Sequence, residues 1–444
     1  MRYLFLITFV FTFQISNSQN ISGLQAQKDL CKMVQWVKEV HYNPFLISDS
    51  VMFQKAYDYK YQLYGQKDSV SLNSFTLDAM QLLAMLNDAH TSINLISKPL
   101  IPGLKENEFW NIPLTFHPNH GIQISTERDA TKLIQSINGV PVEELYYQSM
   151  MCFGGNENFR REISQSLFFP IYLHLAEIHA PYNVLFSDGS KRIIEQGVDI
   201  NEMLKTFGAK KEPYTFQIIQ GNIGLLSYNS CENSKDFKSF LSTTFKEISE
   251  KGLETLIIDI RQNTGGNSIL NDMLLAYVTE KPYRQSAGRY WKVSAHFKEI
   301  IQQKRYVKLW GKSFVKKYVE APNHSILKED EYALVLPKRP RDYFSGQSIL
   351  LIGPMTFSSA NFLADAVDTY NLMPLAGTPT GENTNDFGEQ ITLELPQSKL
   401  ELQVSIAYDI GADGESNRIE TVDPTVYADT NVIQVALQYL SEFK

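Results

Sequence analysis

The chain has 444 residues, of which 43% are hydrophobic and 20% are charged. This composition is typical of a globular protein, and the length exceeds what one ordinary core supports, so two or three domains are expected. The formal net charge of −8 argues against nucleic acid and anionic membranes as partners.

Residues 1–18 have the pattern of an export signal. Arg2 supplies positive charge and an apolar run follows it, while Ser16 and Ser18 place small residues three and one before a cut ahead of Gln19. The run is too short to span a bilayer, and no other stretch approaches the length of a membrane span. We therefore expect an exported protein, periplasmic or secreted, with no membrane span after signal cleavage.

The chain has three cysteines, Cys31, Cys152 and Cys231. Their isolated, wide spacing fits neither a zinc motif nor a dense disulfide framework. We expect three buried thiols, and the alternative is one disulfide with one free thiol.

Residues 19–107 are expected to form a helical segment. Apolar residues recur there at helical spacing, namely Phe75, Ala79, Leu82, Leu83 and Leu86. This helix leads directly into "NDAHTSINL", where Asp88 and His90 flank Ala89 and a strand-like stretch follows.

Residues 108–200 contain short strand-like runs separated by turn residues, which predict a small, mostly β domain. The run "KLIQSINGVPVEEL" has the pattern of a strand, a turn at Asn138-Gly139, a second short strand and an acidic helix start.

In residues 201–444, strand and helix patterns alternate, which predicts an α/β domain with a buried parallel sheet. The β-branched run "LIIDIR" is followed by "QNTGGNS", whose Gly265-Gly266 pair ends the strand. Residues 280–345 are rich in Lys, Arg and Tyr with weak periodicity and are interpreted as an insertion or a lid. Apolar residues alternating from Ile391 to Ile406 predict a hairpin.

The stretch "SILLIGPMTFSSANFLADAV" places Ser358 and Ser359 where a buried strand turns into a helix. Such serines commonly cap helices. A serine can also act there as a nucleophile, if a base such as histidine takes its proton and backbone N–H groups receive an oxyanion. His90 and the Gly265-Gly266 turn could supply these parts, although each also has an ordinary structural explanation.

Four stretches in order along the chain carry a resemblance: "LNDAHTSINL", "LIIDIRQNTGGNS", "LIGPMTFSSANF" and "LAGTPTGEN". They resemble the successive hallmarks of the C-terminal-processing and tricorn-core serine peptidases, relatives of the tail-specific proteases. "LIQSINGVPVEEL" also resembles the second half of a PDZ-like module. The resemblance covers about residues 30–430 and implies an α/β core of the ββα-spiral (ClpP/crotonase-like) fold, a degenerate PDZ-like domain, peptide or unfolded-protein substrates, and no metal or organic cofactor.

The resemblance also implies residue roles. Ser358 matches the nucleophile, and the N–H of Ser359 with that of Gly265 or Gly266 would form the oxyanion hole. Ser359 is also expected to cap the helix. His90 matches the base of the tricorn-like branch, in a "D-x-H-T" context.

That branch completes its charge relay with a late glutamate, for which Glu420 is the best match and Glu415 the reserve. Asn383 stands where the C-terminal-processing branch has its catalytic lysine, so a Ser-Lys dyad is excluded at that site.

Two departures from the family pattern keep alternatives open. Ala89 replaces a serine before the histidine, and Asn361 replaces a common glutamate after the serine-alanine unit. The leading hypothesis is an exported serine endopeptidase. One alternative is a catalytically inactive protein that binds peptides by strand addition, and another is a hydrolase acting on a different acyl substrate such as a small ester.

Overall fold

The computed structural model describes residues 20–104, 108–117, 121–126, 129, 131–207 and 211–442. The predicted signal, residues 1–18, lies outside them. No helix in the described part of the chain is long and apolar enough to cross a membrane.

Three helices form the N-terminal part of the molecule: α1 (Gly23–Val40), α2 (Ser50–Gly65) and α3 (Leu72–Ala84). Ser22 begins α1 with a capping box, because its hydroxyl accepts the Gln25 N–H while the Gln25 side chain accepts the Ser22 N–H. α3 is the amphipathic helix expected from the sequence, with its apolar stripe buried. The loop after α3 carries His90.

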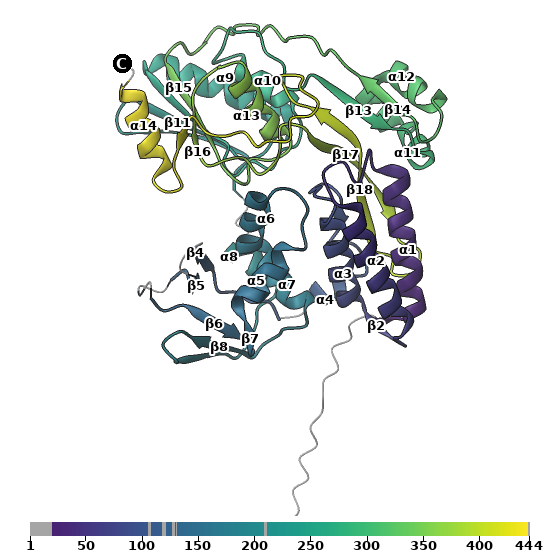
Figure 1. Ribbon diagram of the computed structural model, residues 1–444. Helices are drawn as coiled ribbons and strands as arrows, with labels where there is room; N and C mark the ends of the chain where they lie inside the picture. The colour runs from purple at the N-terminus through teal and green to yellow at the C-terminus, as the bar shows by residue number, and fades with distance from the viewer. Residues whose placement is uncertain are drawn as a thin grey trace, which may run out of the picture.

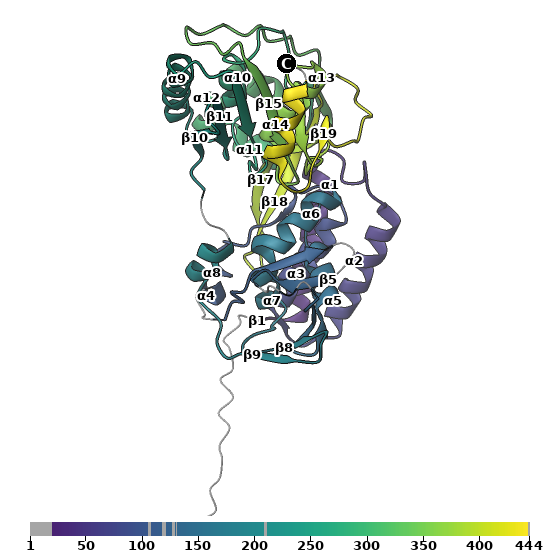
Figure 2. The same cartoon turned by 90° about the vertical axis from the view of Figure 1, so that its left-hand side faces the viewer.

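The chain next forms a smaller α+β part at the opposite end from the large sheet (Figures 1 and 2). Its strands are β4 (Leu114–His117), β5 (Gly121–Ile124), β6 (Ile134–Ile137), β7 (Val140–Pro141), β8 (Tyr182–Phe186) and β9 (Lys191–Ile194). Its helices are α4 (Ile101–Leu104), α5 (Val142–Met150), α6 (Glu157–Ile163), the π-helix η1 (Ser164–Phe168), α7 (Phe169–Leu175) and α8 (Ile200–Phe207).

This part corrects the expectation of a mostly β domain in residues 108–200. The hairpin turn is present, since Asn138 and Gly139 both have positive φ between β6 and β7. However, the apolar run from Phe168 to Leu175 is almost fully buried as helix, and a short apolar run does not by itself distinguish helix from strand.

A six-stranded sheet in the order β10-β11-β12-β15-β16-β19 forms the centre of the C-terminal half. β10 is antiparallel and the other strands are parallel to their neighbours. The strands are β10 (Tyr214–Ile219), β11 (Ile223–Tyr228), β12 (Thr255–Asp259), β15 (Gln347–Ile352), β16 (Leu375–Gly377) and β19 (Val426–Tyr427). This is the mixed α/β architecture that the alternating pattern predicts.

Helices cover both faces of this sheet (Figure 1). α9 (Ser234–Glu250), α10 (Ile269–Leu275) and α13 (Ser359–Thr369) share one core with Leu256 and Ile258 of β12. α14 (Val432–Glu442) shares a second core with Ile257. Because alternate residues of β12 face opposite sides, the strand is apolar along its whole length.

A second sheet, β14-β13-β18-β17 with β3 paired to β18, joins the two halves of the chain. Its strands are β3 (Ser92–Ile93), β13 (Gly288–Lys292), β14 (Ile326–Glu329), β17 (Asp386–Glu394) and β18 (Glu401–Ile410). The expected hairpin is β17–β18, which runs from the large sheet to the N-terminal helices (Figure 1). Asp29 of α1 accepts two N–H groups of its turn, and β3 follows His90 directly. The hairpin therefore fixes the His90 loop against the C-terminal half.

Residues 280–345 do not form a simple insertion. β13 is an integral strand, pairing with β18 on one side and β14 on the other. α11 (Ala295–Ile301) and α12 (Lys304–Glu320) lie between β13 and β14 in the chain. The helical periodicity of this segment is weak because α12 is interrupted at Gly311, whose φ is 81°.

The cysteines are all free, and Cys31 is exposed whereas Cys152 and Cys231 are buried. The expectation of three buried thiols is therefore wrong for Cys31, which lies on the solvent side of α1.

Candidate active site

Ser358 stands at the N-terminus of α13, after the turn that ends β15. Its φ of 55° and ψ of −125° are unusual for a residue with a side chain. Strained backbone of this kind persists only where the surroundings hold it, and it concentrates at functional sites. The Ser358 N–H is held by the carboxylate of Glu382.

His90 connects Ser358 to a carboxylate. Its Nε2 lies 3.4 Å from the Ser358 Oγ, and its Nδ1 lies 3.5 Å from Oε1 of Glu382. The imidazole also stacks on Phe357, with 4.8 Å between ring centroids, and Phe159 stacks on the other side of Phe357. A hydroxyl, an imidazole and a carboxylate thus lie in sequence, brought together from segments far apart in the chain.

Asp88 supports the His90 loop from beneath. Its carboxylate accepts the His90 backbone N–H at 2.8 Å and the Thr91 hydroxyl at 2.5 Å, and it lies 3.0 Å from Nε2 of the buried His41. Burial alone would raise the pKa of Asp88, but the hydrogen bond and charge of His41 hold it at about 2. Asp88 is therefore a fixed negative charge, 4.0 Å from the His90 Nδ1.

The expected relay residue Glu420 lies elsewhere, which corrects the sequence-based choice. Its side chain is 71% exposed and pairs with Arg418, and only its backbone carbonyl approaches the site region, by accepting the Thr384 N–H. The reserve Glu415 is also exposed. The physical reason is that the segment holding both glutamates contributes backbone hydrogen bonds, while Glu382 contributes the buried carboxylate.

Glu382 stands in the "PTGEN" run, next to Asn383. The sequence analysis compared Asn383 with the catalytic lysine of one branch of the family. It assigned no role to the adjacent Glu382. No local sequence pattern predicts that Glu382 is buried. Its position between a glycine and a buried strand is a feature that could have suggested a functional role.

Asn361 and Ala89, the two departures from the family pattern, both have structural partners. The buried Asn361 donates its Nδ2 to the Asn383 carbonyl at 2.8 Å, which ties α13 to the segment that carries Glu382. Ala89 lies against Gly155, where an added Cβ would be 3.1 Å from the Ala89 Cβ. Neither residue blocks access of His90 to Ser358.

The Gly265-Gly266 turn lies directly beside the serine pair. A Cβ on Gly265 would lie 2.7 Å from the Ser358 Cβ and 2.9 Å from the Ser359 nitrogen, so only glycine fits. The Gly265 N–H is already bonded to the buried Asn263 at 2.9 Å. For the N–H groups of Gly266 and Ser359, residues 20–442 as far as they are described supply no acceptor.

Ser359 does not cap α13 with its side chain as expected. Ser358 occupies the N-cap position, and the Ser359 hydroxyl instead donates to the Gly266 carbonyl at 2.7 Å. This bond connects the serine pair to the glycine turn. The positive φ of Ser358 directs the chain away from ordinary capping geometry.

Acidic side chains surround this site at an unusual density. Burial raises the pKa of Glu382 well above its ordinary value, and the neighbouring Asp386 raises it further. Burial and then Asp88 raise the pKa of Asp386 in the same way. Burial lowers the pKa of His90, against the opposing pull of Asp88, so the imidazole is neutral at neutral pH and can accept a proton.

The reacting groups open into a cavity of about 570 Å³. Trp310 and Leu309 of α12 form part of its wall, so residues from the 280–345 segment border the site. Its lining on the catalytic side comprises His90, Gly266, Ser358, Ser359, Glu382 and Asp386. The volume suits several residues of an extended chain.

Part of the chain matches a known protein family. Residues 222–428 match the model of peptidase family S41. The chain carries a peptidase family S41 domain. It spans β11 to β19, including Ser358, Gly265, Gly266 and Glu382, whereas His90 lies before it. No curated protein matches the chain.

Two solved structures resemble the chain over nearly its whole length. The CPAF S499A mutant has a TM-score of 0.63 and 13% sequence identity, and covers 95% of this chain and 96% of its own. Mature CPAF complexed with lactacystin has a TM-score of 0.60 and 12% identity, covering 95% and 97%. At this identity the likeness is one of fold. The family match supports a serine-type peptidase, which acts on peptides or proteins.

Proposed function

We propose that the protein is a serine endopeptidase in which Ser358 attacks the peptide carbonyl, His90 accepts and returns the proton, and Glu382 orients His90. One observation carries this proposal: the two nitrogens of His90 lie 3.4 Å from the Ser358 Oγ and 3.5 Å from the Glu382 carboxylate, although the Nδ1 contact does not have normal hydrogen-bond geometry. Resting sites often have such long contacts, which shorten when substrate binds.

The charges around the site favour proton transfer from Ser358 to His90. When His90 takes the Ser358 proton it becomes an imidazolium, and the ionised Asp88 stabilises it from 4.0 Å. Glu382 holds the Nδ1 side of the ring and the Ser358 backbone together. Positioning and charge are thus divided between two carboxylates, where a simple triad uses one.

The oxyanion formed in this reaction needs two N–H donors. We assign Gly266 and Ser359 to this role, because the Gly265 N–H is bonded to Asn263. The positive φ of Gly266, 132°, lets its N–H approach a ligand that a side chain would exclude. His90 returns its proton to the leaving amine, and water repeats the attack on the acyl-enzyme.

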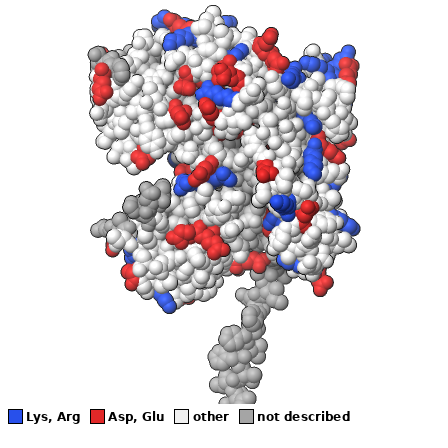
Figure 3. Space-filling model, in the orientation of Figure 1, with Lys and Arg blue, Asp and Glu red and all other residues white. Residues whose placement is uncertain are grey.

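The remaining parts of the proposal concern the scaffold. The large sheet with its helices would be the ββα-spiral core, and residues 108–200 would be a degenerate PDZ-like module that presents peptides by strand addition. The N-terminal 18 residues would direct export to the periplasm or the medium. Charges of both signs are mixed over the face of the molecule in Figure 3.

A serine-directed fluorophosphonate probe and a mixed peptide library test the function together. We expect wild type to be labelled and to cleave peptides, and Ser358→Ala to do neither, while Ser359→Ala keeps measurable cleavage through its backbone N–H. A wild-type protein that takes up no probe and cuts no peptide overturns the proposal and favours the inactive peptide-binding alternative. Labelling with cleavage of esters alone would favour the other acyl substrate.

A further inference from the structure

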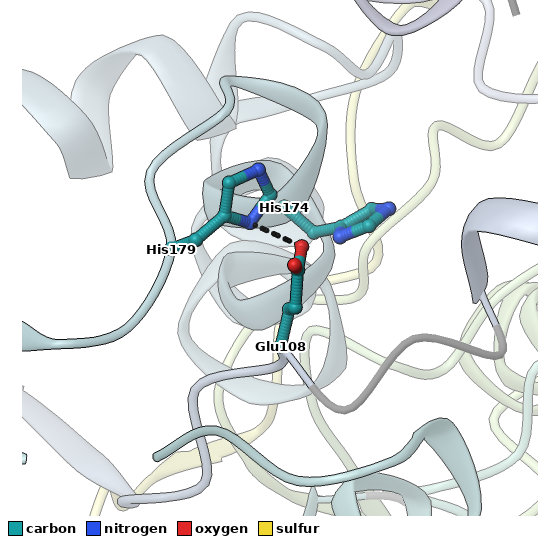
Figure 4. Close-up of side chains that lie close together, drawn as sticks. All are labelled: Glu108, His174 and His179. Carbon is teal, nitrogen blue, oxygen red and sulfur yellow. Dashed lines mark ion pairs between the residues drawn. The ribbon is translucent and has the colours of Figure 1, made fainter. Parts of the chain in front are cut away.

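A second group of imidazoles and carboxylate lies in the small α+β part, away from the peptidase site. Glu108, His174 and His179 have ligand atoms that all lie within 4.8 Å of one another. The two rings lie on either side of the Glu108 carboxylate (Figure 4). Within the described ranges, no other group of three His, Cys, Asp or Glu side chains meets this criterion.

We propose that these three side chains bind a divalent transition-metal ion of the Zn²⁺ class. Two imidazole nitrogens and one carboxylate oxygen form a ligand set that suits zinc better than it suits calcium or magnesium. Water would complete the tetrahedron, and the side chains of Glu108 and His179 are 32% and 24% exposed.

The strongest support is a buried nitrogen without a partner. His174 is only 3% exposed, and its Nδ1 has no hydrogen bond in the described structure. A buried polar atom of this kind costs free energy unless a partner compensates it. The Nδ1 of His179 and Oε2 of Glu108 are likewise buried with no hydrogen bond of normal geometry, although they lie 3.0 Å apart.

Neighbouring residues hold the ring of His174 and the backbone at Glu108 and His179. The ring of His174 stacks on Phe109 at 4.7 Å, and the Glu108 carbonyl accepts the Tyr182 hydroxyl at 2.5 Å. The His179 carbonyl accepts the Asn138 side chain at 3.1 Å. Neighbouring ligands of a tetrahedral zinc lie about 3.3 Å apart, so small side-chain rotations would close the group.

The location gives the ion a structural consequence. Glu108 precedes Phe109, whose backbone pairs with Val198, while His174 belongs to α7 and His179 to the loop before β8. An ion bound by all three would therefore join the first segment of the small part to its helix and its sheet. Because an ion that binds only the folded chain stabilises it, thermal stability reports occupancy.

The test uses the chain from Gln19 onward, freed of metal with a chelator and then titrated with Zn²⁺ in a calorimeter. We expect one ion per chain and a melting temperature that rises by a few degrees with Zn²⁺. Glu108→Gln and His179→Ala, both at partly exposed positions, should weaken binding at least tenfold and abolish the rise while keeping the wild-type circular dichroism spectrum.

Two controls separate this site from other histidines. His296→Ala removes an imidazole that pairs with Glu39 in another part of the molecule, and His90→Ala removes the imidazole of the peptidase site. Both should bind Zn²⁺ like wild type. Absence of binding in wild type, or unchanged binding in Glu108→Gln and His179→Ala, overturns the proposal. The absorption of Co²⁺ in place of Zn²⁺ adds a direct readout, since tetrahedral coordination gives intense visible bands only in proteins with the intact ligand set.

Discussion

Two groups of imidazole and carboxylate side chains in this molecule differ in what stands beside the imidazole. His90 lies between a serine hydroxyl and Glu382, among further buried acids. His174 and His179 instead share one carboxylate, that of Glu108. The first arrangement can move a proton from hydroxyl to ring, and the second offers lone pairs to a cation. The neighbours of an imidazole, more than its burial, therefore decide its chemistry.

Among the substitutions that test the difference between these two groups, His90→Gln is expected to have the largest effect. Loss of the base should lower kcat/KM by at least about 10⁴-fold, because serine without a base is a poor nucleophile. Zn²⁺ binding should be unchanged, since His90 is not part of the second group. Peptidase assays and calorimetry on the same preparation measure both. Retained peptidase activity would remove His90 from its assigned role, and lost Zn²⁺ binding would place the ion at the peptidase site.

The next effect separates the two glutamates. Glu382→Gln keeps the shape of the side chain and an oxygen for the Ser358 N–H, but it loses the carboxylate beside His90. We expect kcat/KM to fall roughly a thousandfold or more.

Glu420→Gln is the matched control, because Glu420 is exposed and paired with Arg418. It should cleave the same peptides at the wild-type rate. If instead Glu420→Gln is the damaging change and Glu382→Gln is mild, the carboxylate predicted from the sequence is the working one after all, and substrate binding must rearrange the site.

Glu382 and Glu420 also show how much of the candidate site could be predicted from the sequence. Ser358, His90 and the two glycines stand where predicted elements end, so local patterns made them candidates, and the family resemblance supplied their roles. Glu382 reaches His90 only through contacts that no local pattern encodes, such as the bond from Asn361 to Asn383. The family resemblance concerns its neighbour Asn383, which replaces a catalytic lysine, and it assigns no role to Glu382.

The small α+β part was harder to predict for a related reason. Its helix α7 comes from a short apolar run that is compatible with a strand, and only tertiary packing decides between them. Glu108 and His174 are 66 positions apart, and no spacing rule joins them. The parallel strands of the large sheet, by contrast, are buried on both faces and therefore read as continuous apolar runs.

A smaller effect is expected at the glycine turn. Gly265→Ala would place a Cβ 2.7 Å from that of Ser358, at a φ of 99°. A displacement of the nucleophile by about 1 Å costs roughly 100-fold in rate. Gly189→Ala is the matched control, since its φ of 79° imposes the same kind of backbone strain with no atom within 4 Å of the new Cβ.

Gly189→Ala should lose about 1–2 kcal/mol of stability through its backbone conformation. Gly265→Ala should lose more, because its new Cβ also meets Ser358 and Ser359. Only Gly265→Ala should lose activity. Equal activity of the two variants would mean that the turn does not position Ser358, and the close approach of Gly265 would then serve packing alone.

The smallest effect concerns the acids around His90 and is a change in stability. Burial raises the pKa of Asp386 well above the value of about 3.9 in an unfolded chain. Between these two pKa values the folded protein holds a proton that the unfolded chain has lost, so stability falls as pH rises through this window.

Asp386→Asn removes that dependence of stability on pH. Its melting temperature should match wild type near pH 4 and exceed it by a few degrees at pH 8, whereas the exposed Asp58→Asn should show no such growth. A variant that is less stable than wild type at pH 8 would mean that the Asp386 charge is compensated in the folded state.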